Sequence, residues 1–154
     1  MSETIQATVV VSGQNGVLIR GESGSGKSFL ALSLIRNGGW LVGDDRVHVS
    51  VVHDRLLASV PAAIEGLMEL RGRGLIAVPC ERSAVVRLVV DIVAEEALDR
   101  MPDESQLVTT VLGVELPRQP VPRRSKAAIP LVEAALAALS PPAVMGLRTI
   151  GVWG

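Results

Sequence analysis

Gly21-Glu22-Ser23-Gly24-Ser25-Gly26-Lys27-Ser28 satisfies every position of the G-x-x-x-x-G-K-[ST] pattern, which is typical of a phosphate-binding loop. The apolar run Gly16 to Ile19 precedes this stretch, and a run with helical spacing, Phe29 to Ile35, follows it. The stretch therefore lies between a predicted strand and a predicted helix, which is the context in which such a loop binds phosphate.

The residue types of this loop suit a nucleotide. Gly24 and Gly26 lack a Cβ, so the backbone can curl until its N–H groups point at phosphate oxygens, and the N-terminus of the next helix adds a partial positive charge. We expect residues 21–28 to bind ATP, with Lys27 at the β- and γ-phosphates. The Ser28 hydroxyl is then the expected Mg²⁺ ligand.

Length and composition predict one domain over residues 1–154. A chain of this length buries about two thirds of the surface that its unfolded form exposes, so it needs no disulfide or structural metal. Aromatic residues make up only 2% of the chain, so the core must consist of Ala, Val, Leu and Ile, and the Val-rich runs favour strands.

Charge and hydropathy exclude several classes of partner. The net charge of −1 offers no field for nucleic acid or an anionic membrane, although Arg118, Arg123, Arg124 and Lys126 form a locally basic cluster. No run reaches the roughly 18 apolar residues of a membrane span, and the N-terminus does not resemble a signal peptide. The single cysteine, Cys80, is expected to be a small buried residue in a reducing compartment. We expect a cytoplasmic protein.

Periodicity and turn residues predict many short strands and two helices. The helices are expected from Lys27 to Asn37 and from Pro130 to Leu139, where Ser140-Pro141-Pro142 ends the second one. Pro117 to Pro122 is expected to be an extended loop. The expected strands are 5–11, 17–20, 40–43, 47–51, 55–60, 67–70, 75–78, 84–94 and 107–116, with hairpins joining the first two and the fourth to the fifth. This count predicts an α/β fold of the mixed α+β kind, with a mixed sheet around the phosphate loop.

A second group of chemically active residues follows the predicted strand 40–43. A strand that runs parallel beside the phosphate loop would place Asp44-Asp45 at the γ-phosphate, where phosphoryl transfer needs a carboxylate. Asp91 is the rival, because Leu88-Val89-Val90-Asp91 has the form of a conventional Walker B strand. The apolar run continues through Ile92-Val93, which favours a position within a strand and leaves Asp44-Asp45 as the preferred pair.

Three ordered motifs resemble the HPr kinase/phosphorylases, bacterial enzymes that phosphorylate a serine of the phosphocarrier protein HPr and can remove that phosphate. The motifs are Gly21 to Ser28, Leu41-Val42-Gly43-Asp44-Asp45-Arg46-Val47, and Glu69-Leu70-Arg71-Gly72-Arg73-Gly74-Leu75-Ile76. The resemblance covers about residues 5–140 and corresponds only to the family's C-terminal catalytic domain, with no counterpart of the N-terminal domain of longer members.

This resemblance implies roles for individual residues. Lys27 contacts phosphate, Ser28 and Glu69 hold Mg²⁺, and the pair Asp44-Asp45 contains the base that takes the proton of the acceptor hydroxyl. Leu98-Asp99-Arg100 resembles the family's Tyr-Asp-Arg, which makes Arg100 a candidate cation at the transferring group. Residues 120–126 resemble a family loop that is tied to dephosphorylation and to contacts between subunits.

The chain also departs from the family pattern. Gln6 stands where the family usually carries a histidine, and Phe29 stands where an acidic residue often follows the motif serine. Pro79 to Ala84 replaces a Gly-Ala-rich stretch, and residues 123–126 lack the family's glycine and asparagine. Since Gln6 cannot carry a proton, we expect weak or absent phosphorylase activity.

For two further pairs of charged or titratable residues, an ordinary surface position is an open interpretation. His48 and His53 belong to the second hairpin, where alternation predicts surface positions, and with one distant cysteine they form no zinc pattern. Arg71 and Arg73 form either a phosphate clamp or a solvated turn.

Three functions remain open from the sequence. The preferred one is a Mg-ATP-dependent serine kinase that acts on HPr or a similar protein, with a homo-oligomer, a hexamer in the family, as the implied assembly. The second is a nucleotide-binding regulatory module without productive transfer, and the third is a small-molecule kinase.

Overall fold

The computed structural model of the chain describes residues 1–139. Its helices are α1 (Lys27–Arg36) and α2 (Ala128–Ala137), with short 3₁₀ turns at Ala62–Ile64, Glu95–Ala97 and Glu104–Leu107. Its strands are β1 (Ser2–Ile5), β2 (Thr8–Ser12), β3 (Asn15–Arg20), β4 (Trp40–Gly43), β5 (Val47–Val52), β6 (Arg55–Ser59), β7 (Leu67–Leu70), β8 (Gly74–Ala77), β9 (Ser83–Val93), β10 (Val108–Val111) and β11 (Val114–Pro122). None of the helices in this range is long and apolar enough to cross a membrane.

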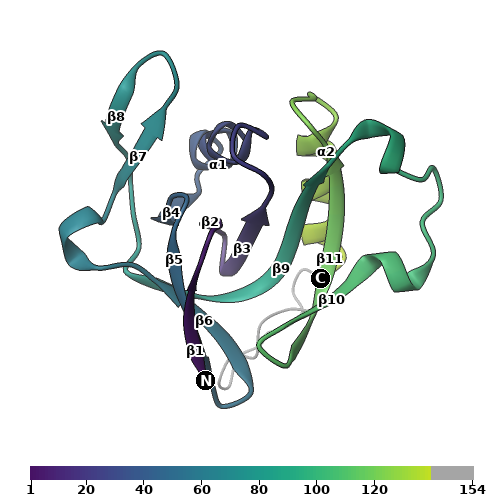
Figure 1. The fold of residues 1–154 in the computed structure, drawn as a ribbon, viewed down its shortest axis with the longest axis horizontal. Helices are drawn as coiled ribbons and strands as arrows, with labels where there is room; N and C mark the ends of the chain where they lie inside the picture. The colour runs from purple at the N-terminus through teal and green to yellow at the C-terminus, as the bar shows by residue number, and fades with distance from the viewer. Residues whose placement is uncertain (140–154) are drawn as a thin grey trace, which may run out of the picture.

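A mixed sheet forms the body of the protein. Its strand order is β1-β5-β6-β9-β3-β2-β4, with β11 joined to β9 and β10 to β11. β9 is parallel to β3 and to β11, and the other neighbours are antiparallel. Figure 1 shows α1 and α2 on one side of this curled sheet and the β7–β8 hairpin as a separate arm beside α1. The expected α/β fold with a mixed sheet is confirmed.

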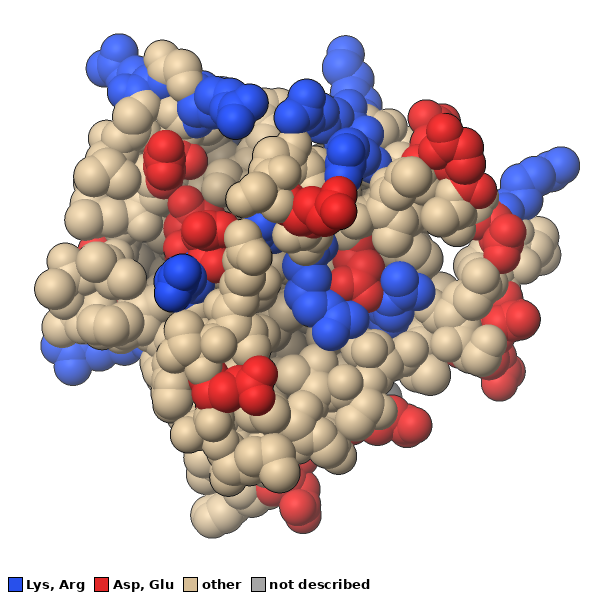
Figure 2. Space-filling model, in the orientation of Figure 1, with Lys and Arg blue, Asp and Glu red and all other residues tan. Residues whose placement is uncertain are grey.

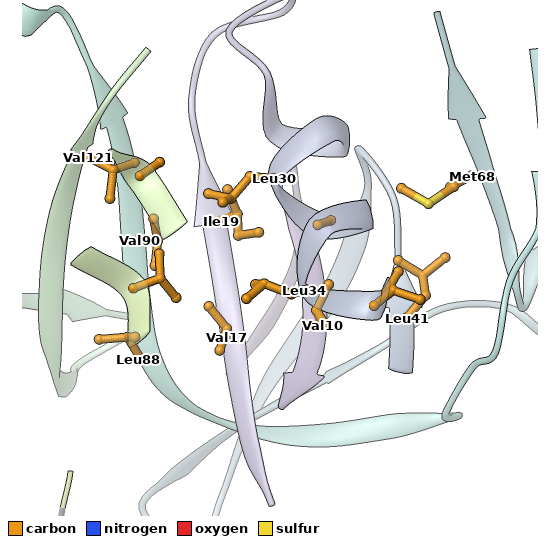
Figure 3. Packing of buried hydrophobic residues seen from close by; sticks show 14 residues of the cluster. Val10, Val17, Ile19, Leu30, Leu34, Leu41, Met68, Leu88, Val90 and Val121 are labelled. Atoms are coloured by element: carbon orange, nitrogen blue, oxygen red, sulfur yellow. The ribbon is translucent and has the colours of Figure 1, made fainter. Parts of the chain in front are cut away.

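The central strands are buried on both faces. In β3, alternation sends Val17 and Ile19 toward α1 and Leu18 to the opposite side, and all three are fully buried. Figure 3 shows the helix-side cluster, where the side chains of Leu30 and Leu34 on α1 lie against those of the strands. Because both faces of these strands are buried, their sequences are continuous Val-rich and Leu-rich runs rather than alternating apolar and polar residues.

Strand β9 connects the two parts of the sheet. Its first residues pair with β6, as in Leu57 opposite Val85, and its later residues pair with β3 on one side and β11 on the other. The phosphate loop follows β3, so the position of that loop depends on this central strand.

Three expectations about strands are wrong. The expected loop Pro117 to Pro122 is the second half of β11, in which Arg118 to Pro122 pair with β9. β10 pairs with β11 only as far as Pro117, so beyond that residue β11 has no partner on its other side within the described residues. A proline in such an edge strand can lack its N–H without the loss of a hydrogen bond between strands. Residues 107–116 form a hairpin that turns at Leu112-Gly113. The single strand expected at 5–11 is two strands, which pair with different neighbours on either side of Gln6-Ala7.

The remaining expected elements are confirmed, with small shifts of boundary. The hairpins β2–β3 and β5–β6 form as predicted. α1 ends at Arg36 with Asn37 as its C-cap, and α2 begins at Ala128, two residues before Pro130. The expected stop at Ser140-Pro141-Pro142 lies outside the described residues.

An ionic cluster joins β3, β9 and β11 at the end of β3. The Arg20 guanidinium donates to both Asp91 carboxylate oxygens, at 2.7 and 2.8 Å, and Arg118 Nε donates to Asp91 Oδ2 at 2.5 Å. Burial alone would raise the pKa of the Asp91 carboxyl, but the hydrogen bonds from the two arginines outweigh burial and hold that pKa below its usual range. Asp91 therefore stabilises the strand pairing while it is ionised.

We expect Asp91→Asn to lower the free energy of unfolding by about 2 kcal/mol at pH 7. Breaking a fully buried ion pair costs about 3–5 kcal/mol, and partial exposure of the arginines reduces that cost. Because the folded-state pKa is lowered, this stability is present above the unfolded pKa of about 4 and is lost as the pH falls through the folded value. Urea unfolding at a series of pH values measures the difference, which should vanish in acid; a pH-independent difference would contradict the assigned role of the charge.

Candidate active site

The phosphate loop has the predicted strand-loop-helix setting. It begins directly after β3 and ends in the first turn of α1, where no side chain caps the helix N-terminus. Gly24 and Gly26 have φ values of +78° and +106°, which residues with a Cβ rarely adopt. At Gly21 an added Cβ would lie 2.5 Å from the hydroxyl oxygen of the fully buried Ser25. The glycines are therefore required by this backbone, and the free N–H groups of the helix can bind an anion.

Lys27 is folded back over the loop. Its side chain is only 6% exposed, and Nζ donates to the carbonyl oxygens of Gly21 at 2.9 Å and Glu22 at 3.4 Å. The nearest carboxylate is that of Asp45, with Oδ1 3.9 Å from Nζ. The ammonium group is thus held at the loop, where a phosphate would meet it.

Asp44 is the centre of a hydrogen-bond network. Its Oδ1 accepts from Ser28 Oγ at 2.8 Å and from Thr8 Oγ1 at 3.0 Å, and its Oδ2 accepts from the backbone N–H of Glu69 at 3.0 Å. The expectation of a strand directly beside the loop is wrong, because β2 lies between β3 and β4. Since β2 is antiparallel to both, β4 still ends at the same edge as β3 and delivers Asp44 to Ser28.

Asp45 is held in a different environment from Asp44. Its backbone has a φ of +67°, its side chain is 59% exposed, and its Oδ1 accepts from Gln6 Nε2 at 3.5 Å. The backbone N–H donates to Thr8 Oγ1 at 3.1 Å. Of this neighbouring pair, Asp44 is fixed by donors, whereas Asp45 is open to solvent in front of Lys27.

Thr8 is a site residue that sequence reasoning missed. It is fully buried, donates to Asp44 and accepts from the N–H of Asp45, so a single hydroxyl sets the position of both aspartates. The available signal was a polar residue at the start of the Val-rich strand β2, before Val9, Val10 and Val11.

Asp44 connects the two candidate Mg²⁺ ligands, Ser28 and Glu69. Asp44 joins the Ser28 hydroxyl to the backbone of Glu69, whose side chain is exposed. Within residues 1–139 no three His, Cys, Asp or Glu side chains gather as a metal site. This donor set suits Mg²⁺, which binds through one or two protein oxygens plus substrate phosphates.

Two arginines from the segment after β11 contact the phosphate loop. Arg123 Nη2 pairs with Glu22 Oε1 at 2.7 Å, and the Arg124 guanidinium donates twice to the carbonyl oxygen of Gly24, at 3.1 and 2.5 Å. The basic cluster seen in the sequence is thereby divided, because Arg118 belongs to the Asp91 cluster. Only the tertiary structure brings residues a hundred positions apart together at this loop.

Arg100 and Asp91 are not joined to the loop. Arg100 is exposed in the segment after β9 and makes no hydrogen bond or ion pair in the described part of the chain, so its role stays a prediction. Asp91 lies within β9, as the continuing apolar run predicted, and its bonds are to arginines rather than to Ser28 or Lys27. His48 and His53 are exposed, as expected. Cys80 is a free thiol that is partly buried against the helix-side core rather than fully buried as expected.

Comparisons with known proteins identify relatives of this arrangement. A family model described as the HPr Serine kinase C-terminal domain matches residues 2–146. The HPr kinase/phosphorylase of Geobacillus thermodenitrificans is 38% identical over 123 residues, which are 71% of this chain and 38% of that protein. That of Clostridium tetani is 48% identical over 64 residues, 42% of this chain and 21% of that protein. The chain thus spans well under half the length of these curated relatives.

A solved structure has the same fold. It is described as the Hpr(Ser) kinase/phosphatase from Coxiella burnetii, and it superimposes with a TM-score of 0.74 and 29% sequence identity over 88% of each chain.

We expect Lys27→Ala to weaken ATP binding about tenfold or more. The substitution removes a charge-assisted contact to phosphate, and hydrogen bonds to charged groups are worth about 1.5–3 kcal/mol. Isothermal titration of ATP into the native and variant proteins measures the change. Equal affinities, with equal turnover, would show that the nucleotide binds elsewhere.

Proposed function

Because the chain belongs to the family of HPr serine kinase C-terminal domains, we propose that it transfers the γ-phosphoryl group of Mg-ATP to a serine of HPr or of a similar protein. The observation that carries this proposal is the 2.8 Å bond from Ser28 Oγ to Asp44 Oδ1. It joins the phosphate loop to the carboxylate pair, and phosphoryl transfer requires these two halves of a site at one place.

The phosphate loop supplies nucleotide binding in this proposal. Its backbone N–H groups and Lys27 bind the phosphates, and the contacts of Arg123 and Arg124 with Glu22 and Gly24 hold the loop in shape. Ser28 and Glu69 would hold Mg²⁺, and Asp44 orients the Ser28 hydroxyl. An Mg²⁺ ion bound there would supply positive charge that offsets the negative charge developing during transfer.

The aspartate pair contains the base that takes the serine proton. Asp45 has an exposed carboxylate in front of Lys27, and Asp44 accepts three hydrogen bonds, one of them from the metal ligand Ser28. Loss of either carboxylate stops transfer, since a general base needs a free carboxylate and the metal site needs an oriented serine hydroxyl. The two losses differ in how strongly they affect Mg-ATP binding.

We expect Asp45→Asn to abolish transfer while Mg-ATP binds as before, and Asp44→Asn to abolish transfer and weaken Mg-ATP binding. The assay incubates the protein with γ-labelled ATP, Mg²⁺ and HPr from the same cell and looks for label on serine. Asp54→Asn, at the exposed turn after β5, is the matched control and should transfer at the native rate. Full transfer by both site variants, or no label on serine with the native protein, would overturn the proposal.

A nucleotide-binding regulatory module is the second candidate. The observation that favours it is Gln6, which stands where the family usually has a histidine and whose amide lies 3.5 Å from Asp45 Oδ1. An amide beside the carboxylate cannot shuttle a proton. A protein with that function would bind ATP and transfer no label in the assay above. A kinase must transfer label.

We expect the forward reaction to exceed the reverse by a wide margin. The reverse step uses inorganic phosphate to remove the seryl phosphate as pyrophosphate, and a group that titrates near neutral pH would help to move its proton. Gln6 cannot titrate, so Gln6→His should raise pyrophosphate release from serine-phosphorylated HPr in added phosphate. The native protein is the comparison. A native reverse rate that rivals the forward rate, with no gain from the histidine, would contradict this limit.

A further inference from the structure

The β7–β8 hairpin is anchored by one face only. Its strands pair with each other and, in the described part of the chain, with no strand of the main sheet. Met68 is 1% exposed and packs in the helix-side core beside α1, and its cross-strand partner Ile76 packs against the same cluster. Figure 3 shows Met68 on the far side of α1 from β3. A two-stranded hairpin is marginally stable alone, so this contact holds the arm in place.

Apart from Glu69, the other face of the hairpin is apolar, and it is exposed within residues 1–139. Because side chains alternate along a strand, Leu67, Glu69, Leu75 and Ala77 share the face that points away from Met68. Leu75 is 72% exposed and Leu67 is 38% exposed. Leu75 lies directly opposite Glu69 in the register, so this apolar face includes the candidate Mg²⁺ residue.

The tip of the hairpin is basic. Arg71 and Arg73 are exposed and make no hydrogen bond or ion pair through their side chains within the described range. Gly72 and Gly74 have φ values of +92° and +97° and form the turn that presents them. Figure 1 shows the tip extending beyond α1, and Figure 2 shows Lys and Arg side chains at that end of the molecule. Neither arginine contacts the phosphate loop within the described range, so their side chains are open to a partner.

The base of the hairpin is tied to the proposed catalytic pair. The Glu69 N–H donates to Asp44 Oδ2 at 3.0 Å, so the outer face begins one hydrogen bond away from the carboxylates. A macromolecule seated on Leu67, Leu75 and Ala77 is therefore held next to Asp44-Asp45, as an acceptor of phosphoryl transfer must be.

We propose that the outer face and basic tip of the β7–β8 hairpin are the docking surface for the protein acceptor. The acceptor surface that fits is an apolar patch bordered by acidic side chains, which complement Arg71 and Arg73. This inference rests on the proposed function, because it assumes a protein acceptor. It adds a recognition site built mainly on residues outside the phosphate loop and the aspartate pair, with Glu69 at its border.

The test measures binding of HPr from the same cell to the full chain in the presence of a non-hydrolysable ATP analogue and Mg²⁺. Leu75→Ser should weaken binding about tenfold, the effect of losing one well-packed interface side chain. The double variant Arg71→Glu, Arg73→Glu should slow association and remove much of its salt dependence. Affinity for the ATP analogue should stay at the native value in both variants.

Matched controls come from two strands outside the hairpin, β10 and β6. Val108→Ser changes another exposed apolar residue, which is 45% exposed on β10, and Arg55→Glu reverses an exposed charge at the start of β6. Both should bind HPr as the native protein does. Thermal unfolding of every variant verifies that the fold is retained.

The outcomes separate this inference from the proposed function. Native HPr affinity in the hairpin variants overturns the docking surface, even if label transfer proceeds. If the hairpin variants instead lose self-association and keep HPr affinity, the face is an interface between copies of this chain, and the proposal is again wrong. If HPr binding is weakened in the hairpin variants and not in the control variants, the docking surface is supported. This holds even if the native protein transfers no label. No HPr binding by the native protein overturns both.

Discussion

The site depends on the three hydrogen bonds that Asp44 accepts. They come from Thr8 on β2, Ser28 on α1 and the N–H of Glu69 on β7, so one carboxylate joins three elements that are far apart in the sequence. Hydrogen bonds to a charged acceptor are stronger than neutral ones, and leaving such an acceptor unpaired in a half-buried position is costly. The positions of the phosphate loop, the aspartate pair and the β7–β8 hairpin are therefore coupled.

The order and direction of the strands bring the phosphate loop and the aspartate pair together. β3 and β4 run in the same direction with β2 between them, so the phosphate loop and the aspartate pair emerge at one edge. β9 supports that edge from the other side of β3, through strand pairing and through the Asp91 cluster with Arg20. Burial of both sheet faces by apolar side chains gives the rigidity that positioning of phosphate requires.

Charge at the loop is distributed over segments with different roles. Lys27 lies inside the loop, Arg123 and Arg124 contact its outer side, and Asp45 faces Lys27 at 3.9 Å. The arginines are engaged with Glu22 and with the Gly24 carbonyl, so they hold the loop as well as adding positive potential. A net charge close to zero for the chain thus conceals a locally ordered arrangement of opposite charges.

The sequence alone determined the phosphate loop, its strand-loop-helix setting, α1, the hairpins and the mixed sheet, because these follow from local rules: glycine where φ is positive, period 2 in strands and period 3.6 in helices. It also favoured Asp44-Asp45 over Asp91. It could not reveal the role of Thr8, the contacts of Arg123 and Arg124, the separation of β3 from β4 by β2, or β11 in place of a proline loop. Those features depend on which segments become neighbours, and burial and strand pairing between distant residues decide that only when the whole chain has folded.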